Sequence, residues 1–207
     1  MASLQILPAD GRAARGHRAR AAVAAAMLDL LNDGVVKPTA AQIAARAGVS
    51  LRLVFHHFED LEAVLADAAD LQFERLRPLI RSVSPSLAFD RRVVEFVRIR
   101  TELHEAVSPV RRASIRLEPF SPVIVERLVN ARAILRNEAG LVFRSELATL
   151  PAAERRDALA ALEAVSAWET WEVMRTQQGL SPTQARKAIA HTITAILHEQ
   201  WKTSSNA

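Results

Sequence analysis

With 207 residues, of which 50% are hydrophobic, the chain is long enough to form one or two domains with a substantial core. It contains no cysteine, which excludes a disulfide framework and a cysteine nucleophile. The formal net charge is +4, and the whole excess falls in residues 1–58, where seven basic side chains accompany three acidic ones. A negatively charged partner such as nucleic acid is therefore expected at the N-terminal part of the chain.

The composition favours helices throughout the chain. Alanine, leucine, arginine and glutamate are abundant, and no segment shows the dense alternation of β-branched residues that is typical of strands. We expect an all-α protein of about nine helices. The longest apolar stretches are well short of the ~20 residues that cross a membrane, and no early apolar run has the pattern of an export signal. A cytoplasmic protein without membrane contact is expected.

The first predicted elements are a basic arm and a long helix. Residues 1–13 show little periodicity and are expected to form a flexible arm. A helix is predicted from about residue 14 to residue 33, and Gly34 ends it. The arginines that precede or open this helix are Arg12, Arg15, Arg18 and Arg20. We expect them to contact a polyanion, against the alternative that the arm only improves solubility.

The segment 39–58 has the pattern of two short helices joined by a glycine turn. Thr39 can cap a helix over about 40–47, and Gly48 can adopt the left-handed conformation that ends it. Ser50 can then cap a second helix over about 51–57. This arrangement is a helix-turn-helix, whose second helix enters the major groove of DNA. We expect residues 14–60 to form a DNA-binding domain and residues 61–207 a helical effector-binding and dimerisation domain.

The residues expected to contact DNA come from the arm, the caps and the second helix. Val54 and Phe58 share one side of that helix, so the residues between them point elsewhere. Arg52 is expected to read a guanine edge. For His57, packing against the next helix is the alternative to DNA contact. The complete candidate set is Arg15, Thr39, Ser50, Leu51, Arg52, Phe55, His56 and His57.

These residues resemble the DNA-binding domain of the TetR family of bacterial regulators. The resemblance implies a helix-turn-helix regulator that binds DNA as a dimer. Phe55 stands where the family usually has a tyrosine, and Leu61 where it usually has a lysine, so two contacts to the DNA backbone are missing. The matching positions, which have no gap in their spacing, are Gly34, Thr39, Ile43, Ala44, Ala47 to Ser50, and Phe55 to Phe58.

Prolines divide the rest of the chain into predicted helices. A helix from about residue 61 is expected to bend or end near Pro78. Helices are also expected over 88–107 and 110–118, with Pro109 between them. Long helices are predicted over 123–147 and 152–178, and the last helix begins after Ser181.

The helix predicted over 152–178 has an apolar surface that is wider than one core requires, because its apolar residues advance by threes. We expect this surface and the apolar side of the last helix to form a homodimer interface, a four-helix bundle around a twofold axis. The run from Trp168 to Ile189 is similar to the helix pair through which TetR-family members dimerise. The alternative is a helix that its own chain covers on all sides. The expected interface residues are Leu162, Val165, Trp168, Trp171, Ile189, Ile193 and Ile196.

Charged residues on an apolar helix face indicate a second candidate site. Arg100 and His104 lie on or beside the apolar face of the helix predicted over 88–107, where an unpaired charge is costly. They are expected to be partly exposed or paired with Glu102 and Glu105, and the alternative is that they bind a small-molecule effector. The candidate pocket residues are Phe96, Arg100, His104, Arg116 and Trp168.

No catalytic or cofactor motif is present in the sequence. The six glycines form no nucleotide-binding loop, and no two histidines have i, i+4 spacing, so we expect no enzyme, no cofactor and no metal site. The sequence favours a ligand-responsive transcriptional repressor that binds a palindromic operator as a homodimer. Two alternatives stay open. One is a helical small-molecule-binding protein or enzyme with a purely structural N-terminal unit, and the other is an architectural DNA binder without an effector.

Overall fold

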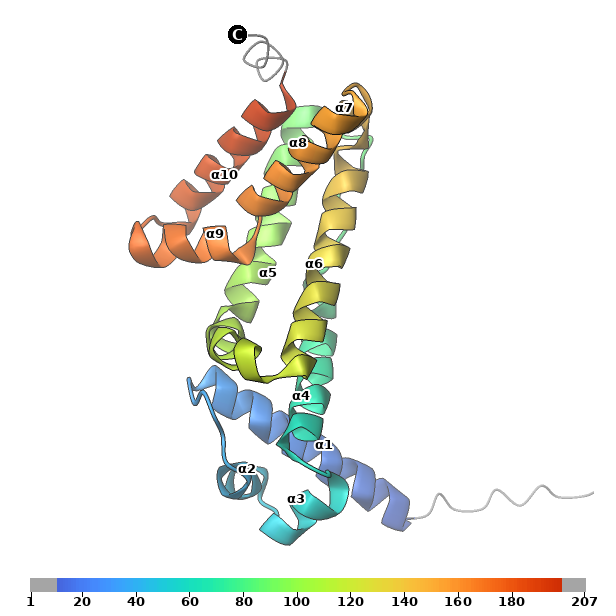
Figure 1. Cartoon of the computed structure of the whole chain (residues 1–207), viewed down its shortest axis with the longest axis vertical. Helices are drawn as coiled ribbons and strands as arrows, with labels where there is room; N and C mark the ends of the chain where they lie inside the picture. The colour runs from blue at the N-terminus through green and yellow to red at the C-terminus, as the bar shows by residue number, and fades with distance from the viewer. Residues whose placement is uncertain (1–10, 199–207) are drawn as a thin grey trace, which may run out of the picture. The chain divides into compact units, whose positions relative to one another are not determined.

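The computed structural model describes residues 11–198, and the side chains from residue 14 onward. The described residues form ten α-helices and no β-strand, which confirms the all-α class (Figure 1). Short 3-10 turns at Arg77–Leu79 and Glu118–Phe120 follow α4 and α5, and a π turn at Val173–Gln177 follows α9. The helices are α1 (Gly11–Asn32), α2 (Ala40–Ala47), α3 (Leu51–His57), α4 (Leu61–Leu76), α5 (Phe89–Leu117), α6 (Pro122–Val142), α7 (Arg144–Ala148), α8 (Ala152–Val165), α9 (Trp168–Glu172) and α10 (Pro182–Leu197).

The chain divides into two compact units. The first contains the residues up to Arg75 together with Pro109–Arg127, and the second contains Leu76–Ser108 together with the residues from Leu128 onward. The predicted DNA-binding domain lies within the first unit, which also includes α4 and the segment that joins α5 to α6. These units are defined by packing. The functional domain boundary after residue 60 therefore stays a prediction.

The core of the first unit holds the helix-turn-helix in place. Helix α1 packs against both α2 and α3 (Figure 1). Ile43 of α2 and Val54 of α3 are buried, as their positions on the predicted inner faces require. Burying a side chain of this size contributes roughly 1.5–3 kcal/mol, so packing stabilises two helices that are too short to form alone. Other buried side chains of this core are Val23, Leu28, Leu31, Phe58, Val64 and Leu65.

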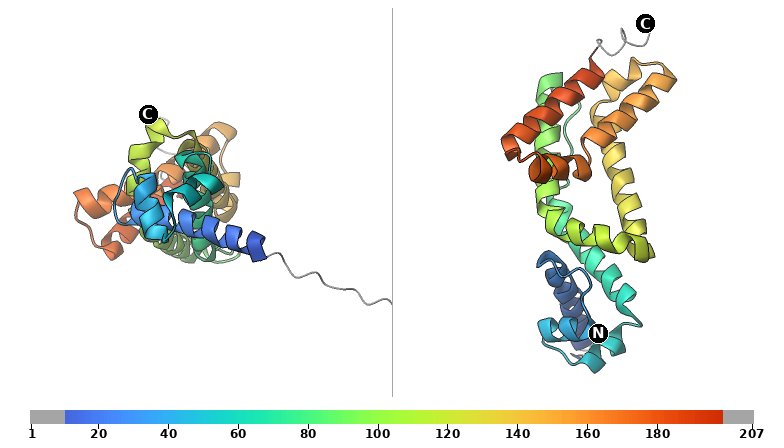
Figure 2. Two further views of the ribbon diagram at one scale, coloured as in Figure 1. Left: turned by 90° about the horizontal axis from the view of Figure 1, so that it is seen from below. Right: turned by 60° about the vertical axis from the view of Figure 1, so that its left-hand side comes forward.

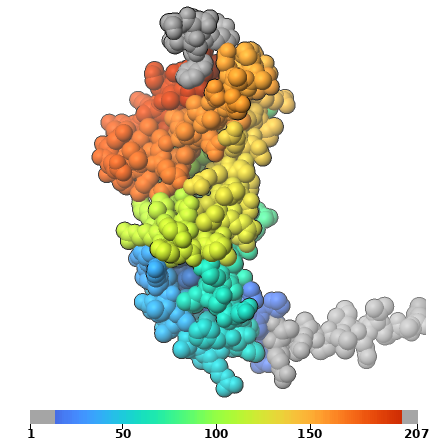
Figure 3. Space-filling view, in the orientation of Figure 1, coloured from blue at the N-terminus to red at the C-terminus, as the bar shows by residue number. Residues whose placement is uncertain are grey.

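The second unit has its own apolar core. Helix α10 lies against α8, and α8, α9 and α10 form one closely packed block (Figures 2 and 3). Phe96 of α5 packs edge to face on Phe143, with 5.2 Å between the ring centroids. The largest fully buried side chains of this core are Trp171, Phe96, Phe143, Leu162, Ile189 and Ile193.

Three predicted helix boundaries are wrong. Helix α5 continues through Pro109 to Leu117, because buried side chains on both sides of the proline, such as Ser108 and Val110, keep the segment packed. The helix predicted over 123–147 is interrupted at Phe143, where α6 ends and the short α7 follows.

The helix predicted over 152–178 is two helices, separated at Ser166 and Ala167. Ala167 has an extended backbone with φ −71° and ψ 155°. The carbonyl oxygen of Ser166 accepts a hydrogen bond from Nε2 of His104 at 2.9 Å, and Oγ of Ser166 donates to the carbonyl oxygen of Leu162 at 2.6 Å. A bond from a distant helix thus replaces the next bond of the helical ladder.

Candidate nucleic-acid interface

The turn between α2 and α3 has the conformation that the sequence predicts. Gly48 ends α2 with φ +66°, and the amide of Val49 donates to the carbonyl oxygen of Ala44 at 3.0 Å. Ser50 begins the second helix, with its Oγ accepting a hydrogen bond from the amide of Leu53 at 3.2 Å. These local bonds fix the direction in which α3 leaves the turn.

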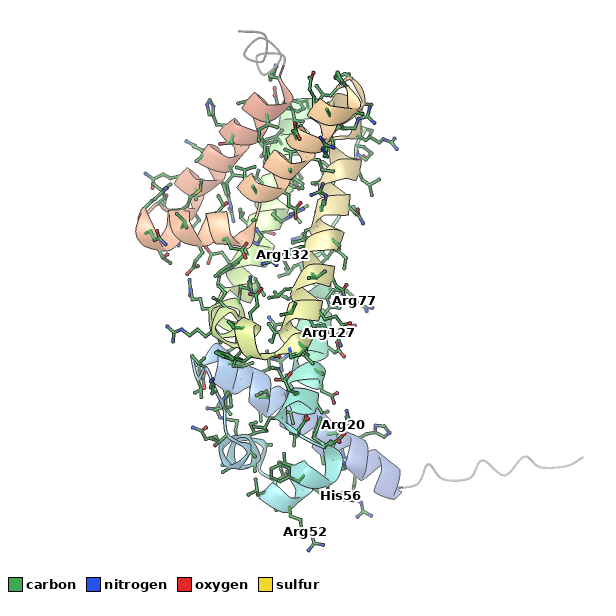
Figure 4. All side chains as sticks on the ribbon, viewed as in Figure 1. Arg20, Arg52, His56, Arg77, Arg127 and Arg132 are labelled. Atoms are coloured by element: carbon green, nitrogen blue, oxygen red, sulfur yellow. The ribbon has the colours of Figure 1, made fainter. Side chains whose placement is uncertain are left out.

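The outer face of α3 presents four exposed side chains, at positions i, i+1, i+4 and i+5. Arg52 and His56 alternate there with Leu51 and Phe55, which are 45% and 54% exposed. Arg52 extends away from the ribbon, and His56 lies on the same helix (Figure 4). Within the described part of the chain, Arg52 has no ion pair or hydrogen bond. This face is therefore free to contact another molecule.

The two capping hydroxyls differ in what they can still do. Oγ1 of Thr39 accepts from the amide of Gln42 at 3.3 Å and donates to Oε1 of Gln42 at 3.0 Å, so the capping box uses both of its functions. Oγ of Ser50 accepts one bond and keeps its own hydrogen to donate. Thr39 thus positions α2, whereas Ser50 can donate to a ligand.

His57 is half-buried, in contrast to its neighbour His56. Its ring lies against α1, where a Cβ added to Gly16 would be 3.6 Å from Cε1 of His57. The two histidine rings meet edge to face, with 5.2 Å between their centroids. His57 therefore packs on α1, and not on the following helix that was the predicted alternative.

Arg20 connects three elements of the first unit. Its guanidinium donates to Asp67 of α4, and Nη1 donates to the carbonyl oxygen of His57, the last residue of α3, at 3.3 Å. Its Cζ lies 4.6 Å from the ring centroid of Phe58. The sequence predicts that Arg20 contacts a polyanion, and the structure shows its exposed guanidinium bonded to Asp67 and to the carbonyl oxygen of His57. No local pattern indicates a partner 47 positions away.

The other basic residues of the first unit fall into two groups. Arg46 is paired with Asp33 at 2.8 Å, and Nζ of Lys37 lies 4.9 Å from the ring centroid of Phe120. Arg15 and Arg18 are exposed on α1, and Arg18 has no ion pair with any described residue. The side chain of Arg12 lies outside the described residues. Among the basic residues of the helix-turn-helix and of α1, the exposed Arg18 and Arg52 have no ion pair with any described residue.

The residues predicted to form an effector pocket fall in both units. Phe96, Arg100, His104 and Trp168 are buried in the second unit, whereas Arg116 is exposed in the part of α5 that belongs to the first unit. Nη2 of Arg100 donates to Glu138 at 2.6 Å and to the carbonyl oxygen of Leu135 at 3.0 Å. The predicted partners Glu102 and Glu105 are therefore wrong for Arg100.

His104 belongs to a buried chain of hydrogen bonds. Besides the bond to Ser166, its carbonyl oxygen accepts from Oγ of Ser108 at 2.7 Å, and this Oγ accepts from Nε1 of Trp168 at 2.9 Å. Burial lowers the pKa of His104 to about 4, with a further contribution from the nearby charge of Arg100 and with the Ser166 bond opposing the shift. His104 is thus neutral at pH 7 and connects α5 to the junction of α8 and α9.

Six of the seven residues predicted for the dimer interface are buried within the single chain, in the second unit. Leu162 and Ile193 are completely buried within the single chain, and Trp171 and Ile189 are at most 2% exposed. Trp168 and Ile196 are buried as well, and Val165 is partly buried against the core that contains Ile196. Helices α5, α8, α9 and α10 of one chain cover this surface, which leaves little of it for a partner.

Two features are absent from the part of the chain that the structure describes. No group of three or more histidine, aspartate or glutamate side chains is arranged to hold a metal ion there. No helix among these residues combines the length and the apolar character needed to cross a membrane.

A helix-turn-helix in the first unit and a larger all-helical second unit define the fold of TetR-type transcriptional regulators. Two solved structures share it. A transcriptional regulator from Rhodococcus sp. Rha1 is 19% identical, with a TM-score of 0.64 over 86% of this chain and 95% of its own. A Rhodococcus protein provisionally named as a TetR-family transcriptional regulator is 18% identical, with a TM-score of 0.63 over 88% of this chain and 100% of its own. The resemblance seen in the sequence is thus confirmed at the level of the fold.

The comparisons of the sequence alone found no relative. No protein-family model matches the chain, and no curated protein sequence matches it.

Proposed function

We propose that the protein is a sequence-specific DNA-binding transcriptional regulator. In this proposal it is a cytoplasmic repressor that binds a palindromic operator as a homodimer and releases it when a small molecule binds. It performs no catalysis. The observation that carries the proposal is the outer face of α3, where Arg52 is exposed and has no partner among the residues that the structure describes, on a helix fixed by caps at both sides of the turn.

The side chains of this face have complementary roles. Arg52 can donate two parallel hydrogen bonds to O6 and N7 of a guanine in the major groove. Ser50 can donate its hydroxyl hydrogen to a phosphate oxygen beside the groove. Arg15 and Arg18 of α1 supply positive charge for further phosphates. Thr39 and His57 act indirectly, because they fix α2 and the end of α3.

A homodimer is proposed because one α3 offers few base contacts. Two copies related by a twofold axis present two such helices to half-sites about 34 Å apart or a multiple of that distance, which requires a palindromic operator. We propose that the dimer interface is formed by other residues than the apolar ones predicted on α8 to α10, such as Leu162 and Ile193, because these are buried in the core of the single chain.

The effector is proposed to bind in the second unit. Arg100 and His104 are buried polar groups whose bonds join α5 to α6 and to the junction of α8 and α9. A ligand that competes for these bonds would change the arrangement of the helices, and a difference of a few kcal/mol between two arrangements is enough to shift their populations. A thermal-shift screen of small molecules, repeated with Arg100→Lys, tests this part.

The main test is a gel-shift titration of the protein on fragments of its own genome. The proposal expects one or a few fragments to bind far more tightly than the rest. Arg52→Ala should lose this preference, whereas Arg91→Ala, which changes an exposed arginine of the second unit, should keep it. Equal and weak binding to all fragments would contradict the proposal.

A further inference from the structure

The exposed face of α3 carries two large apolar side chains that the core does not use. Leu51 and Phe55 are separated by one helical turn and are 45% and 54% exposed. Packing of the first unit depends on other residues of α3, above all Val54, which is 1% exposed. An apolar pair next to the two polar residues of this face therefore needs an explanation outside the fold.

The surroundings of the pair favour a polyanion over a protein surface. Leu51 and Phe55 alternate with Arg52 and His56, and α3 contains no acidic residue. Arg18 on α1 of the same unit adds exposed positive charge. The complementary surface must therefore be negatively charged and must also present small apolar groups.

The major groove of DNA has both properties. Its edges carry phosphates, and among the base edges only thymine presents an apolar group, the C5 methyl. Phe55 has neither a donor nor an acceptor in its side chain, so it cannot form a hydrogen bond with a phosphate or with a base edge. Contact with thymine methyl groups removes apolar surface of both partners from water.

We propose that Leu51 and Phe55 contact thymine methyl groups and so make this regulator prefer thymines beside the guanine that Arg52 reads. The inference rests on the proposed function and specifies the base sequence that the same face recognises. Four residues of a helix rise about 6 Å, and one base-pair step rises about 3.4 Å. The two thymines are therefore about two base pairs apart in each half-site.

The test removes the methyl groups without changing the hydrogen bonds of the bases. A duplex is first selected by the wild-type protein from a randomised library, and single thymines of this duplex are then replaced by uracil. At the contacted positions each replacement should weaken binding about fourfold, the effect of losing one buried methyl group. Uracil at positions outside the half-sites is the control and should have no effect.

The protein variants assign each methyl group to a side chain. Phe55→Ala should bind thymine and uracil equally at one position, and Leu51→Ala should do so at another, while each variant keeps the preference at the position of the other residue. Both side chains are exposed, so circular dichroism should show folded proteins.

The possible failures are distinguishable. If the wild type binds its selected duplex tightly and no uracil replacement weakens it, this inference is overturned while the proposed function stands. If Phe55→Ala and Leu51→Ala both retain the full preference for thymine, the inference is overturned too. The apolar pair would then be expected to contact a protein partner. If no duplex is selected at all, the proposed function fails together with it.

Discussion

The guanidinium of Arg20 and the carboxylate of Asp67 form a two-pronged ion pair, with Nε to Oδ2 at 2.6 Å and Nη2 to Oδ1 at 2.9 Å. Hydrogen bonding to Asp67 raises the pKa of Arg20. The pair joins α1 to α4, and the same guanidinium reaches the last carbonyl of α3 at His57. A displacement of α4 would therefore be transmitted to the end of the helix that is proposed to read DNA.

The first prediction concerns this pair. Arg20→Lys keeps the charge but removes the two-pronged geometry, and it should weaken specific DNA binding because the guanidinium also bonds to the end of α3. A double-mutant cycle with Asp67→Asn should give a coupling energy within about 0.2–1 kcal/mol in urea unfolding, since Arg20 is largely exposed. Arg18→Lys is the matched control. Equal DNA binding by Arg20→Lys and the wild type would show that the pair has no positioning role.

The second prediction assigns sequence readout to Arg52. Arg52→Ala should lose about 1–3 kcal/mol of specific binding, because a guanidinium on a guanine edge discriminates by that amount. Affinity for random DNA should change much less. Fluorescence anisotropy on specific and random duplexes measures both values. Equal losses on the two duplexes would instead make Arg52 a phosphate contact.

The parts of the candidate DNA interface that could be predicted from the sequence are those determined by residues close together in the chain. The bounds of α2 and α3 agree with the predicted 40–47 and 51–57, because caps and a glycine turn act over a few residues. The exposed set of Leu51, Arg52, Phe55 and His56 follows from helical periodicity once Val54 is placed inward.

The features that could not be predicted depend on contacts distant in sequence. The break between α8 and α9 at Ser166 has no helix-breaking residue in the sequence. The carbonyl oxygen of Ser166 accepts a hydrogen bond from His104, 62 positions earlier. The apolar residues of α8 to α10, such as Ile193, have the same periodicity whether a partner or the chain itself covers them. An apolar pattern predicts that a helix face is buried, but it does not distinguish burial by the same chain from burial by a partner chain.

The third prediction concerns the electrostatic contacts of α1. Replacing both Arg15 and Arg18 by glutamine should reduce the slope of log affinity against log salt concentration by about one unit per lost phosphate contact. The folded structure should persist, since both side chains are exposed. Binding titrations at several salt concentrations provide the slope. A slope equal to that of the wild type would exclude these arginines from the interface.

The fourth prediction follows from the buried His104. Its pKa of about 4 lies below the ordinary 6.5, so between these values the unfolded chain binds a proton that the folded chain does not. The free energy of unfolding should therefore fall as the pH decreases from about 6.5 to 4, by up to ~1.4 kcal/mol per pH unit. This part of the pH dependence should be missing in His104→Gln and retained in the exposed control His191→Gln. Urea titrations across this range measure it, and equal slopes for wild type and His104→Gln would refute it.

The fifth prediction distinguishes core from interface in α10. Ile193→Glu places a charge at a completely buried position and should lower the free energy of unfolding by about 4 kcal/mol or more. Ala195→Glu, at an exposed position two residues further along, should leave stability nearly unchanged. Circular dichroism during thermal unfolding compares them. A stable, fully helical Ile193→Glu protein would return this stripe to the candidates for a dimer interface.

The central claim is that α3 reads DNA sequence, and selection from a randomised duplex library tests it most directly. The wild-type protein is predicted to enrich an inverted repeat whose half-sites each contain a guanine, and Arg52→Ala is predicted to lose the preference at that guanine. Enrichment of no sequence by the wild type, or enrichment of the same repeat with the same base preferences by Arg52→Ala, would contradict the account.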